Sequence, residues 1–506
     1  MLFNSLAFVF IYMPIVLAGY FLIAKKSYQG ALAWLAVASI FFYGYWSIRA
    51  LPILLTSICI NYWFGTLLAK QELKYRKFIL IIAIGANLAA LGYYKYINFF
   101  IDNINDVRDL MELDPLDSIG MLLPIGISFF TFTQIAFLID NFQNKVKERN
   151  FIHYALFVSF FPHLLAGPLL NHRQMMPQFS MLENFVIQKE KIATGLLIFT
   201  IGLGKKILIA DTLNGYVSSF YVSLNQGIDP NFLASWLAAI GYTFQLYFDF
   251  SGYSDMAVGA ALLFGIWLPF NFNSPLRATN IIDFWQRWHI TLTKYIGDYL
   301  YTPITLKFMR LSQGLPLVIG TFCSMVVPTF IVFILLGFWH GANWTFVIFG
   351  GMHGFFIVTN HVWRKVFPPQ SRKQNTNQRF RSVKIVTGWV LTFLAVNIAC
   401  VMFRSDSVST ALVVYKGVLG LNGYSLGNMP DIYAWVAGTK VTLLAISSAF
   451  MIIFFMPNTI SVASISENNV LKKSIPAYAS IVILVAIIYG LLQVNFYESP
   501  FLYFQF

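Results

Sequence analysis

The amino-acid sequence predicts an all-α polytopic membrane protein, a chain that crosses the bilayer many times. Of its 506 residues, 58% are hydrophobic and only 11% are charged, and the mean hydropathy is +0.67. Apolar runs of about 20 residues, the length a helix needs to cross the hydrocarbon core, recur along the chain. A soluble chain of this size carries many more charged residues, so lipid is the expected solvent.

The apolar runs predict the membrane helices in order. The first run has no basic residues before it, so we expect a membrane helix rather than a cleaved signal peptide. The predicted spans are residues 4–24, 30–48, 50–69, 78–97, 118–139, 151–170, 192–210, 232–250, 315–337, 342–362, 383–404, 440–456 and 477–495.

Two further apolar stretches, residues 253–272 and 281–301, are interrupted by prolines and charged residues. Broken segments are tolerated at membrane depth only where protein buries them or where they line a cavity. Residues 249–303 are therefore expected to contain the functional centre, inside a bundle with broken or re-entrant helices.

Basic residues predict the orientation of the chain. They gather at Lys25–Lys26 and within residues 70–77, 145–149, 364–384 and 472–473, whereas the loop 102–117 is acidic. The positive-inside rule places the basic loops in the cytoplasm and both termini outside. The net charge of +13 is explained by these loops, so we expect no nucleic-acid partner.

Three cysteines lie far apart in apolar runs, without the spacing of a disulfide framework or a metal site. The sequence contains no DxD spacing and no glycine-rich phosphate loop. Nucleotide-sugar transfer and ATP hydrolysis therefore have no support.

His340 is the first candidate for chemistry. It ends a long apolar run between Trp339 and Gly341, where a small residue leaves room for a substrate. Histidine is the usual general base near neutral pH. From the residues alone, a catalytic base and an interfacial anchor are both open.

His289 is the second candidate, because it lies among polar groups in an apolar stretch. Asp283 and Arg287 are four residues apart and are expected to pair on one helix. A reaction chamber and an amphipathic surface helix both fit this pattern.

Other candidates are weaker. His353 lies among glycines and fits a structural role, and His163 lies where Pro162 and Gly167 break a helix. The stretch 245–255 contains carboxylates and hydroxyls that either position a substrate or cap a broken helix, namely Asp249, Ser251, Tyr253 and Asp255.

Five stretches resemble the membrane-bound O-acyltransferase (MBOAT) family, in its bacterial alginate O-acetylation branch. They are LPIGISFFTF (123–132), FDFSGYSD (248–255), NFNSP (271–275), DFWQRWH (283–289) and GFWHGANW (337–344). Each is short, but together they follow the family order over much of the chain.

The resemblance implies an all-helical bundle with a central tunnel open to both sides of the bacterial inner membrane. His340 matches the catalytic histidine, and His289 matches the second motif position. Trp288, Trp339, Asn343 and Arg287 would then contact or orient substrates.

The resemblance also implies the substrates and the partner. The acyl donor is a cytoplasmic thioester, acetyl-CoA or a carrier-protein thioester, and the acceptor is a polysaccharide outside. A periplasmic SGNH-type acetyltransferase completes the transfer. The aromatic C-terminus, SPFLYFQF (499–506), resembles a tail whose tyrosine, here Tyr503, carries the acyl group; an aromatic membrane anchor is the alternative.

We expect one integral membrane domain over residues 1–506. Its parts are N-terminal helices (1–115), a catalytic core (116–362), a basic cytoplasmic linker (363–384) and C-terminal helices with the aromatic tail (385–506). The alternative functions are a transporter or flippase for a lipid-linked saccharide, whose broken helices look similar, and D-alanyl transfer from a carrier protein.

Overall fold

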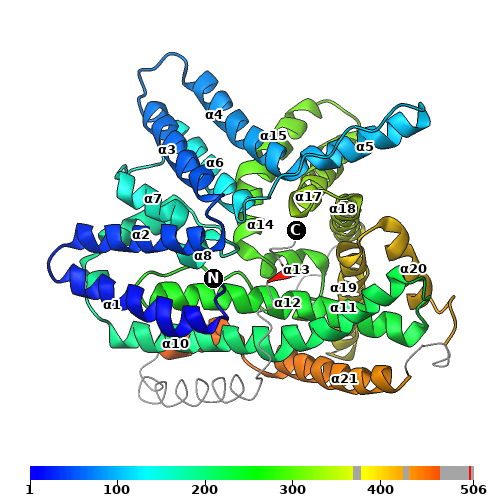
Figure 1. The fold of residues 1–506 in the computed structure, drawn as a ribbon. Coiled ribbons are helices and arrows are strands. Elements are labelled where there is room, and N and C mark those ends of the chain that lie inside the picture. The colour runs from blue at the N-terminus through cyan, green and yellow to red at the C-terminus, as the bar shows by residue number, and fades with distance from the viewer. Residues whose placement is uncertain (368–377, 425–431, 468–500, 503–506) are drawn as a thin grey trace. The chain divides into compact units, whose positions relative to one another are not determined.

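The computed structural model describes residues 1–367, 378–424, 432–467 and 501–502 (Figure 1). Within these ranges the protein is helical, with no β-strand. The chain divides into two compact units. Unit 1 comprises Met1–Leu203, Gly252–Phe270 and Ala463–Gln505, and unit 2 comprises Gly204–Ser251 and Asn271–Val462.

Unit 1 begins with a π-helical turn that continues into α1, followed by further helices, of which α5 and α6 are joined by the long connection 111–126. Its elements are η1 (Phe8–Tyr12), α1 (Met13–Ala24), α2 (Tyr28–Trp46), α3 (Leu51–Leu68), α4 (Arg76–Leu91), η2 (Gly92–Tyr96), α5 (Ile97–Leu110), α6 (Ile127–Phe142), α7 (Phe151–Ser159), α8 (Phe161–Leu164), α9 (His172–Met175), η3 (Met176–Ser180), η4 (Leu182–Phe185) and α10 (Lys189–Gly204).

The long helix α12 (Phe232–Leu262) gives its C-terminal half to unit 1. Glycines bring this half against α10. A Cβ added at Gly202 would lie 2.5 Å from the carbonyl oxygen of Gly252, and one at Gly259 would lie 2.5 Å from the amide nitrogen of Phe199. Small residues allow helix backbones to approach this closely in membrane proteins.

Unit 2 contains the N-terminal half of α12 and most of the later helices. Its other elements are η5 (Lys205–Ala210), α11 (Asp211–Asn225), η6 (Pro275–Arg277), α13 (Ile281–Arg287), α14 (Ile290–Ile296), η7 (Gly297–Tyr301), α15 (Thr302–Leu311), α16 (Leu317–Thr321), η8 (Phe322–Val326), α17 (Val327–His340), α18 (Trp344–Val366), α19 (Gln378–Arg404), α20 (Val408–Val418), α21 (Ile432–Phe455) and the first residues of α22 (Thr459–Glu467), which passes into unit 1 at Ala463.

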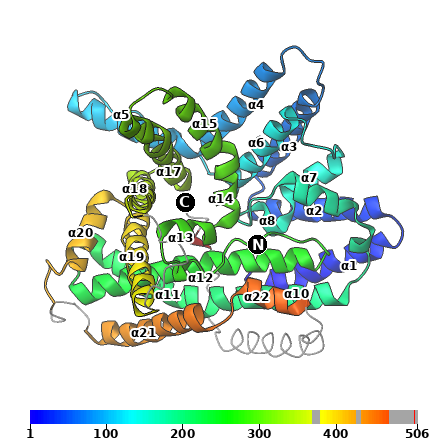
Figure 2. The ribbon, with the colours of Figure 1, turned by 180° about the vertical axis from the view of Figure 1, so that it is seen from behind.

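Helix α18 packs between α17 and α19, as both ribbon views show (Figures 1 and 2). A Cβ at Gly337 would lie 2.1 Å from the carbonyl oxygen of Phe346, and a Cβ at Gly350 would lie 2.1 Å from that of Phe333. Helices α17 and α18 therefore contact each other backbone to backbone, which leaves little freedom in their relative position.

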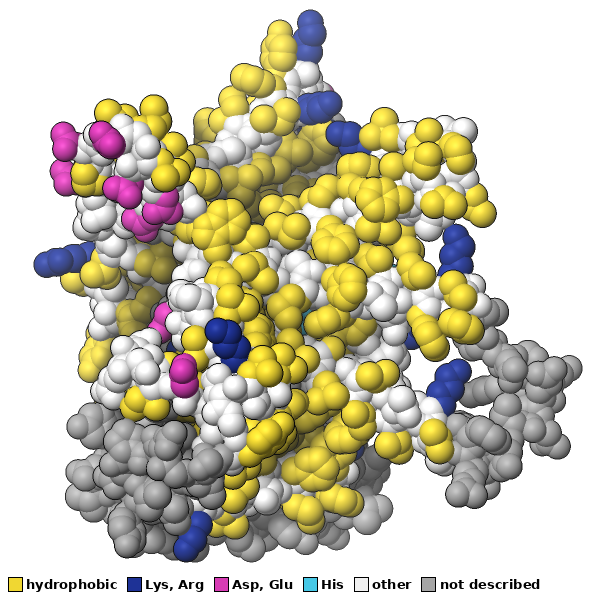
Figure 3. All heavy atoms as spheres, turned by 90° about the vertical axis from the view of Figure 1, so that its right-hand side faces the viewer, with side chains coloured by type: hydrophobic (Ala, Val, Ile, Leu, Met, Phe, Trp, Pro, Cys, Tyr) yellow, Lys and Arg dark blue, Asp and Glu magenta, His cyan; other side chains and the backbone are white. Residues whose placement is uncertain are grey.

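Several helices are long and apolar enough to cross a membrane. Among the described residues these are Leu51–Leu68, Arg76–Leu110, Lys189–Asn225, Leu317–His340, Trp344–Val366 and Ser382–Arg404. Hydrophobic side chains are also numerous on the face drawn in Figure 3, and charged side chains there are fewer. The protein is a multi-pass membrane protein, as its composition predicts.

Three predicted spans differ from the structure. The run 118–139 becomes helical only at Ile127, because Gly126 has a φ of 77°. The run 151–170 ends as a helix at Ser159, before a single turn that contains Pro162. The prediction of separate segments at 232–250 and 253–272 is wrong, because α12 is continuous to Leu262 and its Gly252 packs on Gly202. The predicted span 477–495 lies outside the described residues.

The close contact of α17 and α18 can be tested at neighbouring glycines. We expect Gly350→Ala to lower the melting temperature of the purified protein in detergent, with a cost of about 1–3 kcal/mol, because the new methyl group meets backbone that cannot rotate away. Gly351→Ala is the matched control, since no atom lies within 4 Å of a Cβ there. Equal melting temperatures for the two variants would contradict a close backbone contact between α17 and α18.

Candidate active site

The helical path breaks at Trp288 and His289, between α13 and α14. The Asn280 side chain caps α13 by accepting from the amide of Asp283 at 3.0 Å. Trp288 is extended, and His289 has a φ of 42°, in the left-handed region that residues other than glycine seldom adopt. Such strain persists only where neighbouring groups impose it, and it is frequent at functional sites.

Asn271 imposes that conformation. Its backbone carbonyl accepts from the amide of Ile290 at 2.9 Å. Its side-chain Oδ1 lies 2.6 Å from the Thr291 hydroxyl oxygen and 3.3 Å from Nδ1 of His289. The amide of Asn273 also donates to the carbonyl of Arg287 at 3.0 Å. Segment 271–273 therefore runs beside segment 287–290 and satisfies its backbone groups.

The imidazole of His289 is buried, with 1% of its surface exposed. It meets the ring of Phe250 from α12 edge-on, at 4.8 Å between centroids. His289 lies between two short helices, α13 and α14.

His340 is the last residue of α17. Aromatic rings surround its imidazole: Trp339 at 5.0 Å, Phe403 at 5.3 Å and Phe349 at 6.0 Å between centroids. The side chain of Asn343 begins the next helix by accepting from the amide of Thr345 at 3.0 Å. Its Nδ2 donates to the carbonyl of Asp406 at 3.0 Å, so it also ties this turn to the residues after α19.

His353, on α18, connects His340 at the end of α17 with α13, the helix that leads into His289. The indole N–H of Trp285, on α13, donates to Nδ1 of His353 at 3.3 Å. The ring of Phe349 lies 4.6 Å from that of His353 and also contacts His340. The aromatic contacts therefore run unbroken from His340 to the helix that leads into His289.

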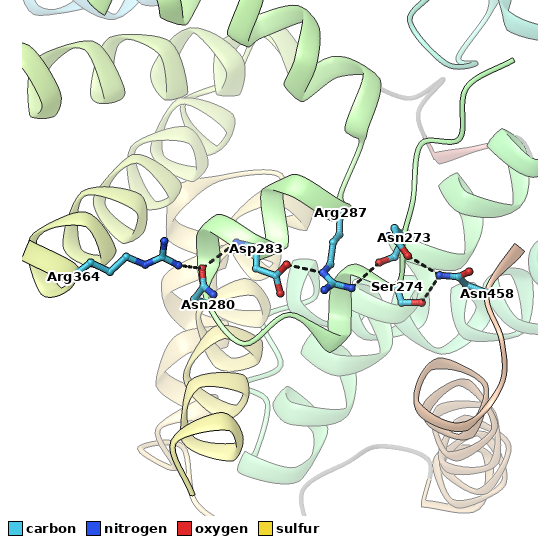
Figure 4. Close-up of polar contacts among 7 residues, drawn as sticks. All are labelled: Asn273, Ser274, Asn280, Asp283, Arg287, Arg364 and Asn458. Atoms are coloured by element: carbon cyan, nitrogen blue, oxygen red, sulfur yellow. Dashed lines mark hydrogen bonds and ion pairs between the residues drawn. The ribbon is translucent and has the colours of Figure 1, made fainter. Parts of the chain in front are cut away.

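Arg287 lies in a line of polar contacts that Figure 4 shows from end to end. Its Nε donates to Asp283 at 2.7 Å, which confirms the predicted pairing four residues apart. The line also includes the contacts of Arg364 with Asn280 at 2.9 Å and of Asn458 with Asn273 at 2.7 Å. These contacts tie α13 to α18 and to Asn458, the residue before α22. Asn458 also contacts the hydroxyl of Ser274, the last member of the line.

Trp288 stacks on Phe284 at 5.5 Å and meets Phe272 edge-on at 5.1 Å. These contacts hold its indole beside the strained histidine. The ring of Tyr247, on α12, also lies near it, at 6.3 Å between centroids.

Asp249 forms a buried ion pair that the sequence alone did not indicate. Its Oδ1 lies 2.7 Å from Nζ of Lys206, and the same ammonium lies 2.8 Å from Asp211. Both Lys206 and Asp249 are buried. Two residues after Asp249, the Ser251 hydroxyl is buried without a hydrogen-bond partner within the described ranges.

The remaining candidates belong to unit 1. The Tyr253 ring lies 4.9 Å from that of Phe3 and 4.4 Å from that of Phe501. Asp255 is buried, and Nε2 of His163 bonds to the carbonyl of Phe157 at 2.9 Å. Tyr503 lies outside the described residues, although Phe501 and Leu502 just before it are buried.

Asn271 and Lys206 are the residues that sequence reasoning missed as parts of the site. Asn271 stands 18 residues before His289, and Lys206 stands 43 residues before Asp249, so no helical spacing relates the partners. The NFNSP stretch was the available signal for Asn271. Among the described residues, no group of His, Cys, Asp and Glu is arranged to hold a metal ion.

The buried ion pair gives a stability prediction. Lys206→Met leaves Asp249 without its cation, and breaking one side of a buried pair costs about 3–5 kcal/mol. We expect a large fall in melting temperature, which Lys206→Met combined with Asp249→Asn should largely restore. Lys205→Met is the control, because the Lys205 ammonium contacts the hydroxyl of Thr459 and not this pair. A double variant as unstable as the single one would contradict the pairing.

Comparison with known proteins assigns the chain to a family. Residues 40–404 match the membrane-bound O-acyltransferase family. The chain is 39% identical to a peptidoglycan O-acetyltransferase of Helicobacter pylori over 458 residues, covering 84% of this chain and 81% of the relative. It is 34% identical to a probable alginate O-acetylase of Pseudomonas putida, covering 100% of both chains. A teichoic acid D-alanyltransferase of Bacillus subtilis is 30% identical over 48% of this chain and 60% of that relative.

The family match spans the segment from α2 to the end of α19 and so includes His289, His340 and the aromatic contacts that join their elements. The resemblance inferred from five short stretches is therefore confirmed, and this protein belongs to the membrane-bound O-acyltransferase family.

Proposed function

We propose that this protein is an O-acetyltransferase that moves an acetyl group from a cytoplasmic thioester across the membrane for O-acetylation of a cell-surface polysaccharide. The observation that carries the proposal is the connection of His340 to the element bearing His289, through Phe349, His353 and Trp285. Two histidines held by one rigid aromatic framework suit a reaction in which two substrates must be aligned.

In the proposed reaction His340 acts as general base. It takes the proton of an acceptor hydroxyl while the hydroxyl oxygen attacks the thioester carbonyl carbon. The new C–O bond forms, the C–S bond breaks, and the proton passes from His340 to the leaving thiolate. Because the side-chain amide of Asn343 bonds to two backbone groups, its contribution is to hold the turn after His340.

His289 and Trp288 would orient the donor or the acceptor. The strain at His289 is consistent with this role, because a side chain in an imposed conformation loses no freedom when the substrate binds. Asp249 acts indirectly in this proposal: its ion pair with Lys206 holds the turn of α12 that places Phe250 against His289.

The names of the relatives, and the share of this chain that each one matches, indicate which acyl group is transferred. The two O-acetyl relatives match 84% and 100% of this chain, whereas the D-alanyl relative matches 48%. This difference favours acetyl over D-alanyl transfer. We infer a bacterial inner-membrane location with both termini outside, acetyl-CoA or an acyl-carrier thioester as donor, and a periplasmic SGNH-type partner that completes transfer to the polysaccharide.

Tyr503 is the proposed relay for the acetyl group. The residues before it enter unit 1, where Phe501 packs against Tyr253 of the 248–255 stretch. The Tyr503 hydroxyl would accept the acetyl group as an ester and then release it to the partner.

The catalytic role of His340 is tested in purified protein reconstituted into vesicles. With radiolabelled acetyl-CoA and the partner acetyltransferase, we expect His340→Ala to lower acetyl transfer by about 100-fold to 10,000-fold at an unchanged protein level. His361→Ala is the control, because that histidine lies near the end of α18 and is partly exposed. Full transfer by His340→Ala, or saccharide translocation without transfer, would refute the proposal.

The relay is tested separately by Tyr503→Phe, which removes one hydroxyl oxygen. We expect loss of label on the intact chain, measured by mass spectrometry of the C-terminal peptide, together with loss of product. Tyr424→Phe serves as the control, because Tyr424 is an exposed residue elsewhere in the chain. Undiminished product formation by the Tyr503→Phe variant would exclude the relay.

A further inference from the structure

The side chain of Asn271 determines which nitrogen of His289 carries the proton. Oδ1 of Asn271 lies within hydrogen-bonding distance of the Thr291 amide at 3.3 Å and of the Thr291 hydroxyl at 2.6 Å. A backbone N–H can only donate, so the amide atom that faces it must be the oxygen. The orientation of the Asn271 carboxamide is therefore assigned by its neighbours.

The same oxygen lies 3.3 Å from Nδ1 of His289. Because a carboxamide oxygen can only accept, the hydrogen between these two atoms belongs to the imidazole. A neutral imidazole with its hydrogen on Nδ1 carries its lone pair on Nε2. The contact thus selects one tautomer of the ring.

Backbone contacts make this selection rigid. The carbonyl of Asn271 holds the amide of Ile290 at 2.9 Å, so one residue contacts both His289 and the residue after it. The left-handed backbone of His289 turns its ring toward Asn271 and Phe250 rather than along the helix direction. All three side chains are buried, with 1% of Asn271, 2% of Phe250 and 1% of His289 exposed.

We propose that Asn271 is a positioning residue that fixes His289 as the Nδ1–H tautomer, so that Nε2 accepts a hydrogen bond from a substrate hydroxyl. This inference rests on the proposed function. It states which partner donates in the hydrogen bond between His289 and the substrate. His289 therefore accepts from a substrate hydroxyl other than the attacking one and cannot donate to the thioester carbonyl. The attacking hydroxyl gives its proton to His340.

Substitutions at position 271 separate the contribution of the Asn271 side-chain oxygen from that of its backbone carbonyl. Asn271→Leu keeps the backbone carbonyl bond but removes the oxygen that faces Nδ1, so we expect kcat to fall at least about 100-fold with little change in KM for the donor. Asn271→Asp keeps an oxygen at the same place, and we expect it to recover most of the lost activity. Asn273→Leu is the matched control, because that side chain bonds to Asn458 and not to His289.

A second measurement uses pairs of variants. If Asn271 acts through His289, the double variant Asn271→Leu with His289→Ala should lose no more activity than His289→Ala alone. Additive losses, or an Asn271→Asp variant that folds but is as inactive as Asn271→Leu, would overturn the inference. If Asn271→Leu does not yield folded protein, Asn271→Ser is used, because its shorter side chain also withdraws the oxygen from Nδ1.

Failure of the inference is distinguishable from failure of the proposed function. Loss of transfer in His340→Ala and His289→Ala with normal activity in Asn271→Leu would reject only the role of Asn271. Normal transfer in both histidine variants would reject the proposed function itself.

Discussion

The arrangement of unit 2 depends on two segments that satisfy each other's backbone where the helical path breaks at Trp288 and His289. Lipid offers no hydrogen bonds, so a broken helix is stable only where protein supplies partners for the exposed amides and carbonyls. Segment 271–273 supplies them to segment 287–290, through the bonds of Asn271 with Ile290 and of Asn273 with Arg287. Without this pairing the chain could not place a strained histidine in a buried position.

Close helix packing provides the second constraint. Glycines at 337 and 350 bring α17 and α18 to backbone contact, and this position puts Phe349 between His340 and His353. The indole of Trp285 then links α18 to α13. Aromatic rings are large and have few rotatable bonds, so a framework made of them holds catalytic groups at little entropic cost.

The sequence predicted some contacts well and others not at all. The pairing of Asp283 with Arg287 was predictable, because a helix brings residues four apart together. The break at His289 was indicated by polar residues in an apolar stretch. The continuity of α12 was not predictable, because glycine disfavours a helix interior, whereas in the structure Gly252 lies within the helix and packs against Gly202. The ion pair of Lys206 with Asp249 joins residues that no local pattern relates.

The sequence by itself determined the membrane class, the helical content and the family, because these follow from hydropathy, apolar run length and motif order. It also identified His340 and His289 as the residues to examine. Only the tertiary structure decided that His340 shares an aromatic framework with the helix leading into His289, and that Asn271 holds His289 in one conformation. These relations join residues far apart along the chain, and such proximity arises from packing, which local sequence does not encode.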